Sequence, residues 1–523
     1  MAQGSKDEAL RRLLPLTLLL FALNSFRFVI DSAPGVGDVA HLRAIALPLG
    51  RLIGWIAGAS EPGLLPEPLR TAPLPLLVDW LLWRLDPVGI AGLHGAHLLL
   101  ALGALALLLR ALAMRIDARA AMVAGFVIAL SPRFVEPIMS LGPDPFVFIL
   151  FCVQLAILLS RGKIGGPQPL AMFAITAAAA GLCGITGMLS SASLFAALIH
   201  AAPDRVALRR RALAALPVLA LWAVPLTAQI LAPPTATWVT SFDLARLGLK
   251  LLAHNADLLQ LPGAALLVGG TAVLIGVGAY GYAMRRLRNG SSERTHPFAL
   301  LLMAALVGTA LVLIAGPLLR LYLWVDPAAQ SWLALLLVLL AAACFTPRLV
   351  QSSGLQRIRR FAAGAMIAGA VAGAIAFQYR ADWFAAGPEA GLQRALQSAG
   401  RNRAIVYASF DWGRAYYPHA WMAPDDGNQW LLSVDAGSVQ RVLDGGQLGQ
   451  PEPLSALDGY DTLVIARIDR RGWRDLNAVT NMDVIGALPP APIDQFPGLW
   501  IAEPARAAPG EYWLTTQLLR KTE

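Results

Sequence analysis

Long apolar runs separated by short polar connections recur along the chain from residue 13 to residue 378. An α-helix of ~20 apolar residues crosses the hydrocarbon core of a membrane, and most of these runs approach that length. The runs lie at residues 13–30, 88–109, 119–138, 145–160, 170–184, 188–202, 212–232, 262–284, 298–316, 331–346 and 361–378. The pattern predicts a mainly α, polytopic membrane protein with about eleven transmembrane helices.

The apolar stretch between Pro167 and Pro203 has two interpretations. It forms either one long helix or two short helices broken at "CGITGM", where glycines interrupt the run. A single helix would reverse the sidedness of every later connection. The distribution of charge therefore decides between the two.

Basic residues concentrate in alternate connections, which read "KDEALRR", "RALAMRIDAR", "RGK", "DRVALRRR", "RRLRNGSSER" and "PRLVQSSGLQRIRR". Lys and Arg collect in cytoplasmic loops, so this alternation favours two helices at "CGITGM" and predicts that the N-terminus is inside. The segments predicted outside are residues 31–87, 139–144, 233–261, 317–330 and the tail from residue 379.

The composition narrows the class of protein. Hydrophobic residues make up 57% of the 523 residues and charged residues only 14%, with a mean hydropathy of +0.58. These values exclude an ordinary soluble enzyme. The net charge of +9 is dispersed between apolar runs, which argues against nucleic acid as a partner. The three cysteines lie inside apolar segments, so no disulfide framework or thiolate metal site is predicted.

The tail is more polar and has a different periodicity. It contains two alternating apolar runs, "RAIVYASF" and "DTLVIARI", a helical pattern in "EAGLQRALQSA" and the turn cluster "PDDGNQ". We therefore predict a transmembrane domain at residues 1–378, with interfacial helices in the first outer loop at 31–87. An extracytoplasmic α/β domain is predicted to follow at residues 379–523.

The predicted outer face gathers the acids that are candidates for chemistry. Asp38 begins the amphipathic stretch "VAHLRAIALPLGRLIGWIAG", whereas Asp31 is interpreted as the polar end of the first helix. Asp144 lies between prolines in "EPIMSLGPDPF". A partly desolvated carboxylate at the membrane edge suits a general base or a metal ligand. A solvated or helix-capping acid is an equally good interpretation of either residue.

The order of these motifs resembles the GT-C superfamily of polyprenyl-phosphate-sugar-dependent glycosyltransferases. The similar branch contains protein O-mannosyltransferases and lipid A aminoarabinose transferases. The segments that carry the resemblance are "GDVAHLRAIALPL", "RTAPLPLLVDWLL", "GPDPFVFILF", "AAAAGLCGITGMLSSASLFAALI" and "GPLLRLYLWVDPAAQSWLALLLV", which together extend over roughly residues 10–378. No single motif among them is diagnostic.

The resemblance implies inverting transfer of a sugar from a polyprenyl-phosphate carrier to a protein, lipid or polysaccharide acceptor. It implies a multi-pass protein of the bacterial cytoplasmic (inner) membrane, working at the outer face. Asp38 matches the catalytic acid of the family and is the expected general base, with Asp144 as a second acid that orients the acceptor or holds a divalent ion. Arg320, Tyr322 and Arg70 are the expected contacts of the donor phosphate.

Other polar residues have a structural interpretation as well as a functional one. Arg320 also suits a topological or headgroup contact, and His41 suits a packing position as well as an acceptor cavity. The histidines at 94 and 97 share a helical face but lack an obvious third metal ligand. His254 and Asn255, in the outer loop at 233–261, are weaker candidates for an acceptor cleft.

Two rival functions stay open. A transporter or flippase of a lipid-linked or polar substrate would show internal repeats and ionisable residues at mid-membrane, and neither pattern is evident. The other is a catalytically inactive envelope-assembly scaffold. The GT-C family commonly has two neighbouring acids in the first outer loop, whereas here Asp38 stands between Gly37 and Val39, and the missing second acid keeps this interpretation open.

Overall fold

The computed structural model describes most of the chain, and every statement below concerns these residues. They are residues 2–31, 41–42, 44–58, 72–85, 89–160, 166–231, 297–318, 327–344, 363–364, 367–372, 374–375, 387–408, 428–432, 438–443, 447–469, 500–503, 506–508 and 513–522. The fold is mostly helical, and its sheet lies in the C-terminal part, as the sequence predicts.

The chain divides into two compact units. The first contains Met1–Ile30, Pro68–Pro234 and Val239–Phe377, and the second contains Asp31–Glu67, Thr235–Trp238 and Gln378–Glu523. One boundary between the units falls between Phe377 and Gln378. Residues 31–67, which the sequence pattern assigns to the transmembrane domain, fall in the second unit.

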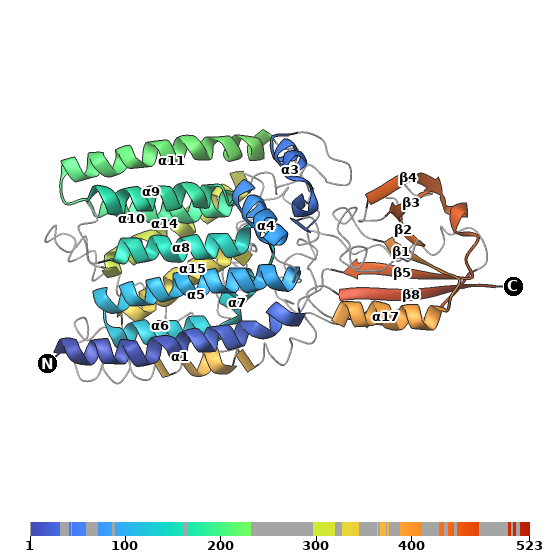
Figure 1. Cartoon of the computed structure of the whole chain (residues 1–523), viewed down its shortest axis with the longest axis horizontal. Helices are drawn as coiled ribbons and strands as arrows, with labels where there is room; N and C mark the ends of the chain where they lie inside the picture. Colours follow the sequence, from blue (N-terminus) through green and yellow to red (C-terminus); the bar gives the residue numbers. More distant parts are fainter. Residues whose placement is uncertain are drawn as a thin grey trace. The chain divides into compact units, whose positions relative to one another are not determined.

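The first unit is a bundle of helices (Figure 1). Its helices are α1 (Ala2–Asp31), α4 (Pro73–Leu85), α5 (Ile90–Arg115), α6 (Ala118–Leu130), α7 (Pro132–Met139), α8 (Pro143–Leu159), α9 (Pro167–Gly181), α10 (Ile185–His200), α11 (Arg205–Leu231), α14 (Pro297–Leu318) and α15 (Pro327–Cys344). Many of them begin at a proline, whose fixed φ and missing N–H suit the first turn of a helix.

Two glycines set the start of neighbouring helices. Gly184, with φ of 95°, separates α9 from α10, so the apolar stretch forms two helices at the predicted interruption. Gly142, with φ of 110°, precedes Pro143 and the first turn of α8. Side chains other than glycine rarely adopt these angles, so both turns depend on the missing Cβ.

The segment predicted as one helix at 119–138 is two helices. The extended backbone of Ser131 ends α6, and Pro132 occupies the start of α7. A proline disfavours helical backbone in the residue before it, which explains the break.

Helix α5 packs against α4, α6, α7 and α8, while α10 packs against α8, α9, α11 and α14. A buried polar contact joins three of the helices: the Gln154 amide of α8 donates hydrogen bonds to the Ser191 hydroxyl of α10, at 2.9 Å, and to the Thr176 carbonyl of α9, at 3.1 Å. Figure 1 shows α5, α6 and α8 running side by side.

Within the described residues, α5 is the one helix long and apolar enough to cross a membrane. Shorter apolar helical segments lie at Leu13–Phe26, Ala118–Leu130, Pro143–Leu159, Ile185–His200, Pro297–Val312 and Ser331–Ala343. The number of membrane spans and their orientation stay predictions.

In the second unit, the amphipathic stretch of the first outer loop is interrupted at Pro48. Helix α3 (Leu49–Ile56) follows this proline, with Leu52 and Trp55 buried and Arg51 exposed. The amphipathic pattern therefore forms a helix of eight residues after the proline and a separate helical segment before it.

The second unit also holds helix α17 (Gly387–Ala399) and a mixed sheet. The strands are β1 (Arg403–Ala408), β2 (Gln429–Leu432), β3 (Ser438–Leu443), β4 (Gln447–Pro453), β5 (Thr462–Asp469), β6 (Trp500–Ala502), β7 (Arg506–Ala508) and β8 (Trp513–Lys521), in the order β4-β3-β2-β1-β5-β8-β6, with β7 also paired to β8. A short 3-10 helix, Leu454–Leu457, leads into β5. Strand β1 is parallel to β2 and β5, and the other pairs are antiparallel.

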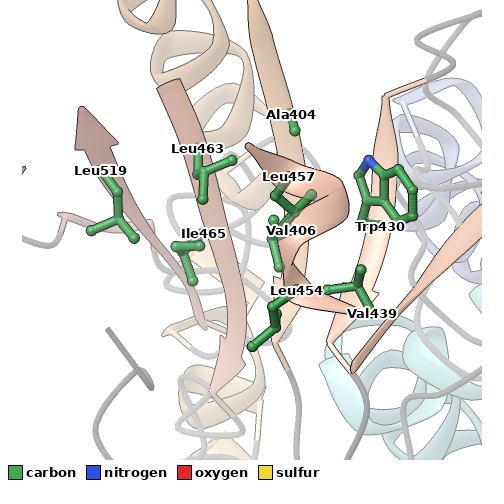
Figure 2. Close-up of a cluster of buried hydrophobic side chains, with 9 residues drawn as sticks. All are labelled: Ala404, Val406, Trp430, Val439, Leu454, Leu457, Leu463, Ile465 and Leu519. Atoms are coloured by element: carbon green, nitrogen blue, oxygen red, sulfur yellow. The ribbon is translucent and has the colours of Figure 1, made fainter. Parts of the chain in front are cut away.

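Successive side chains of a strand point to opposite faces of the sheet, and the central strands place buried apolar side chains on both faces. One face carries the cluster Ala404, Val406, Trp430, Val439, Leu454, Leu457, Leu463, Ile465 and Leu519 (Figure 2). Ile405 and Val464 have the opposite parity and are buried as well. Helix α17 packs against β5, β7 and β8, and the Arg403 guanidinium donates a 3.1 Å hydrogen bond to its Leu396 carbonyl. The runs predicted as strands, "RAIVYASF" and "DTLVIARI", supply β1 and β5.

Candidate functional site

Helix α4, "PLPLLVDWLLWRL", carries a single acid, Asp79, in a segment without other charges up to Arg84, and that acid is buried in the protein interior. The Nε2 atom of His97, on α5, lies 2.8 Å from Oδ1 of Asp79, and both side chains are 0% exposed. With the Nε2 proton present, the imidazole donates this hydrogen bond. The contact ties α4 to the first half of α5.

Two further groups lie close to this pair. His94 is completely buried one helical turn before His97 and is within electrostatic range of both Asp79 and His97. The thiol of Cys183, at the α9–α10 turn, is within electrostatic range of Asp79. The backbone N–H of Leu74 in α4 also donates a 3.1 Å hydrogen bond to the Leu182 carbonyl of that turn. Helix α4 is thus held by α5 and by the α9–α10 turn together.

The imidazole of His97 also contacts the first turns of α8. The ring of Phe146 meets it edge to face, with centroids 5.1 Å apart and an interplanar angle of 76°. Asp144 lies two residues earlier, in the first turn of α8, and is half-buried. The second acid of the predicted site therefore lies two residues before a ring that packs on the imidazole of the buried pair.

The position of Asp144 separates two interpretations that the sequence left open. The N-cap of α8 is Gly142, so Asp144 is a residue of the first helical turn and the N-cap interpretation is wrong. A carboxylate in the first turn is favoured by the N-terminal end of the helix dipole. This end of the bundle can therefore keep a carboxylate charged while it is partly withdrawn from water.

The described part of the chain contains no cluster of three or more His, Cys, Asp or Glu side chains arranged to hold a metal ion. Asp79 and His97 form an acid–imidazole pair. The predicted divalent ion stays a prediction.

The other predicted site residues are distributed as follows. His41 is 0% exposed and belongs to the second unit. The remaining candidates lie outside the described residues; they are Asp38, Arg70, Arg320, Tyr322, His254 and Asn255.

Asp79 is not among the residues that the sequence pattern selects. Its signal is a lone acid in the middle of an apolar run, and such acids are costly to bury unless they are paired. Its partner is one of the two histidines at i and i+3 on the next helix, His94 and His97. The sequence alone does not show that these two helices pack together.

Comparison with known proteins gives structural matches only: no family model matches, and no curated protein matches. An Archaeoglobus fulgidus oligosaccharyltransferase, in complex with Zn and sulfate, aligns over 87% of this chain and 67% of its own, with 14% identity and a TM-score of 0.47. ArnT from Cupriavidus metallidurans, bound to undecaprenyl phosphate, aligns over 97% of both chains, with 11% identity and a TM-score of 0.45.

A further structure of the Archaeoglobus fulgidus oligosaccharyltransferase, tethered to an acceptor peptide containing the NVT sequon, aligns over 78% of this chain and 63% of its own. Its identity is 15% and its TM-score is 0.41. The matched proteins are GT-C glycosyltransferases, the superfamily that the order of sequence motifs resembles. At these identities and TM-scores, residue roles have to come from this chain alone.

Proposed function

We propose that this chain is an integral membrane glycosyltransferase that moves a sugar from a polyprenyl-phosphate carrier to an acceptor at the outer face of the bacterial cytoplasmic membrane. The observation that carries the proposal is the placement of Asp144. It is a half-buried acid in the first turn of α8, two residues before Phe146, whose ring packs on the imidazole of the buried acid–imidazole pair. The order of GT-C-like motifs around it supports the same reaction class.

In the proposed reaction an acceptor oxygen attacks the anomeric carbon of the donor sugar. Asp38 takes the proton of the acceptor, and the bond between the sugar carbon and the phosphate oxygen breaks. Its electron pair leaves on the polyprenyl phosphate, and the configuration at the sugar carbon inverts. Asp144 orients the acceptor hydroxyl, and a divalent cation held by these acids would serve the same purpose.

The leaving phosphate gains negative charge as the bond breaks, so cations and hydroxyl donors that contact it lower the barrier. Arg320, Tyr322 and Arg70 are assigned to this role. His41, His254 and Asn255 are assigned to the acceptor side. The donor tail lies among membrane lipids, and the acceptor is a protein, a lipid or a polysaccharide.

The proposal is tested by mass spectrometry of envelope lipids, glycans and proteins from cells with and without the chain. We expect one species to gain the mass of a sugar only when the wild-type chain is present. Asp38→Asn should abolish this species, because an amide does not accept the proton. Asp31→Asn is the matched control and should leave it unchanged.

An unchanged envelope composition, with the chain inserted at normal levels, would contradict the proposed function. Normal product from the Asp38→Asn chain would remove Asp38 as the base while leaving the transferase assignment in place.

A further inference from the structure

The Asp79–His97 pair has a physical cost that needs a reason. Both side chains are 0% exposed, and Asp79 is the only charged residue of α4 before Arg84. Taking a carboxylate out of water is unfavourable, and a buried pair rarely stabilises more than well-packed apolar side chains of the same volume. Stability alone is therefore a weak explanation for this pair.

The geometry connects the pair to the acid of the proposed site in two steps. The 2.8 Å contact with Asp79 fixes the plane of the His97 imidazole. The Phe146 ring then packs edge to face against this imidazole, at 5.1 Å, and so limits rotation and tilt of the first turns of α8. Asp144 is carried by the first of these turns.

We infer that Asp79 and His97 are positioning residues, which act through Phe146 to hold Asp144 in the orientation that the reaction uses. This inference rests on the proposed function for its role in catalysis. It makes no use of a proton transfer by the pair, and neither residue is assigned a contact with the substrate. The opposing possibility is that the pair is only a fastening between α4 and α5.

A double variant separates the two roles. Asp79→Leu combined with His97→Phe replaces the pair by apolar side chains of similar size and keeps a ring for Phe146 to pack against. Such replacements usually preserve stability. If the pair only holds α4 against α5, this variant should keep both the stability and the function of the wild-type chain. A positioning role predicts that the variant folds but no longer holds the first turns of α8 in one orientation, because no hydrogen bond to residue 79 fixes the plane of the new ring.

The first measurement needs no enzyme activity. Asp144→Cys is introduced together with Cys344→Ala in the purified full chain, and the rate of alkylation by a maleimide is followed. Native Cys152 and Cys183 are buried and should not react appreciably. We expect the introduced thiol to react about threefold faster or more in the double variant, because a loosened first turn exposes it more often.

The control is Gln154→Leu, which removes a buried hydrogen-bonded contact from the same helix but lies far along it from Asp144. It should leave the alkylation rate of the introduced thiol equal to that of the parent chain. Equal rates for the parent chain and the Asp79→Leu/His97→Phe chain would overturn the inference, whatever the chain catalyses.

The second measurement uses Asp144 intact and the polyprenyl-phosphate sugar that the wild-type chain turns over. We expect the double variant to lower kcat about tenfold or more, since small misplacements of a catalytic group are costly, with KM for the donor nearly unchanged. Phe146→Leu keeps the buried pair but removes the ring contact, and it should lower kcat in the same way. Gln154→Leu should not.

The two proposals fail separately. If the wild-type chain transfers no sugar, the proposed function falls, and the alkylation rates still decide whether the pair positions the first turn of α8. If the wild-type chain is active and both the double variant and Phe146→Leu retain its kcat, the positioning role is wrong and the proposed function stands.

Discussion

Gly181, the last residue of α9, packs against the indole of Trp222 on α11. A Cβ atom built on this glycine would be 1.9 Å from the indole Nε1, and that nitrogen donates a 3.1 Å hydrogen bond to the Ala177 carbonyl of α9. Trp222 is buried, so it has little room to withdraw. The approach of α9 and α11 depends on the absence of one methyl group.

Gly181→Ala should therefore destabilise the chain, although alanine normally favours a helix over glycine. The added methyl group displaces the indole and breaks its hydrogen bond, at a net cost of about 1–3 kcal/mol. The measurement is thermal unfolding of the purified chain in detergent. Gly103→Ala is the control, because a Cβ at Gly103 meets nothing within 4 Å. Equal melting temperatures for the two variants would contradict the close packing.

Arg320→Ala should weaken binding of the donor phosphate. The proposed contact is a charge-assisted hydrogen bond, so its loss should raise the Kd for undecaprenyl phosphate about tenfold. Binding is measured on the purified chain by titration with undecaprenyl phosphate. Arg119→Ala, at an exposed arginine near the start of α6, is the matched control. If the Kd is the same for Arg320→Ala and the parent chain, Arg320 does not contact the phosphate.

The predicted orientation has a direct test. The distribution of basic residues predicts that the N-terminus is inside, and the predicted number of helices is odd, so a reporter fused after Glu523 should lie outside the cytoplasm. Alkaline phosphatase at this position should be active, and a fusion within the connection that contains Asp204 should be inactive. The reverse result would invert the whole assignment of inner and outer loops.

The sheet of the second unit should depend on its central strands. Leu463→Ala removes a completely buried side chain from the cluster of Figure 2, and we expect a loss of about 2–5 kcal/mol. Protease resistance of the C-terminal segment in the full chain provides the measurement. Ile501→Ala, at a residue 61% exposed on β6, should change it little. Similar protease sensitivity in both variants would show that this cluster does not hold the sheet together.

Local features are the most predictable from the sequence. The break between α9 and α10 is visible because Gly184 stands between two apolar runs, and β1 and β5 are visible from alternating apolar residues. The break at Pro132 is not predicted, since apolar residues resume soon after Ser131, Pro132 and Arg133 and an apolar window therefore spans the break.

Pairing between distant elements could not be predicted. The Asp79–His97 contact joins residues on two helices, and their spacing in the chain gives no sign of which faces meet. The two parallel partners of β1 likewise could not be predicted: β2 and β5 both follow β1 in the chain but lie on opposite sides of it in the sheet. The assignments of Asp38, Asp144 and Arg320 to the site all stay predictions.

The order of strands also bears on synthesis. Strands β6 and β7 hydrogen-bond with β8, which lies at Trp513–Lys521 and separates them from β5. Strand β8 follows β5, β6 and β7 in the chain, so each of these three strands lacks its β8 partner until β8 has been synthesised. A chain interrupted before residue 513 would leave the β5 edge open for pairing with other polypeptides. Completion of this sheet therefore requires β8, and a chain truncated before it should be recognisable to proteases by that open edge.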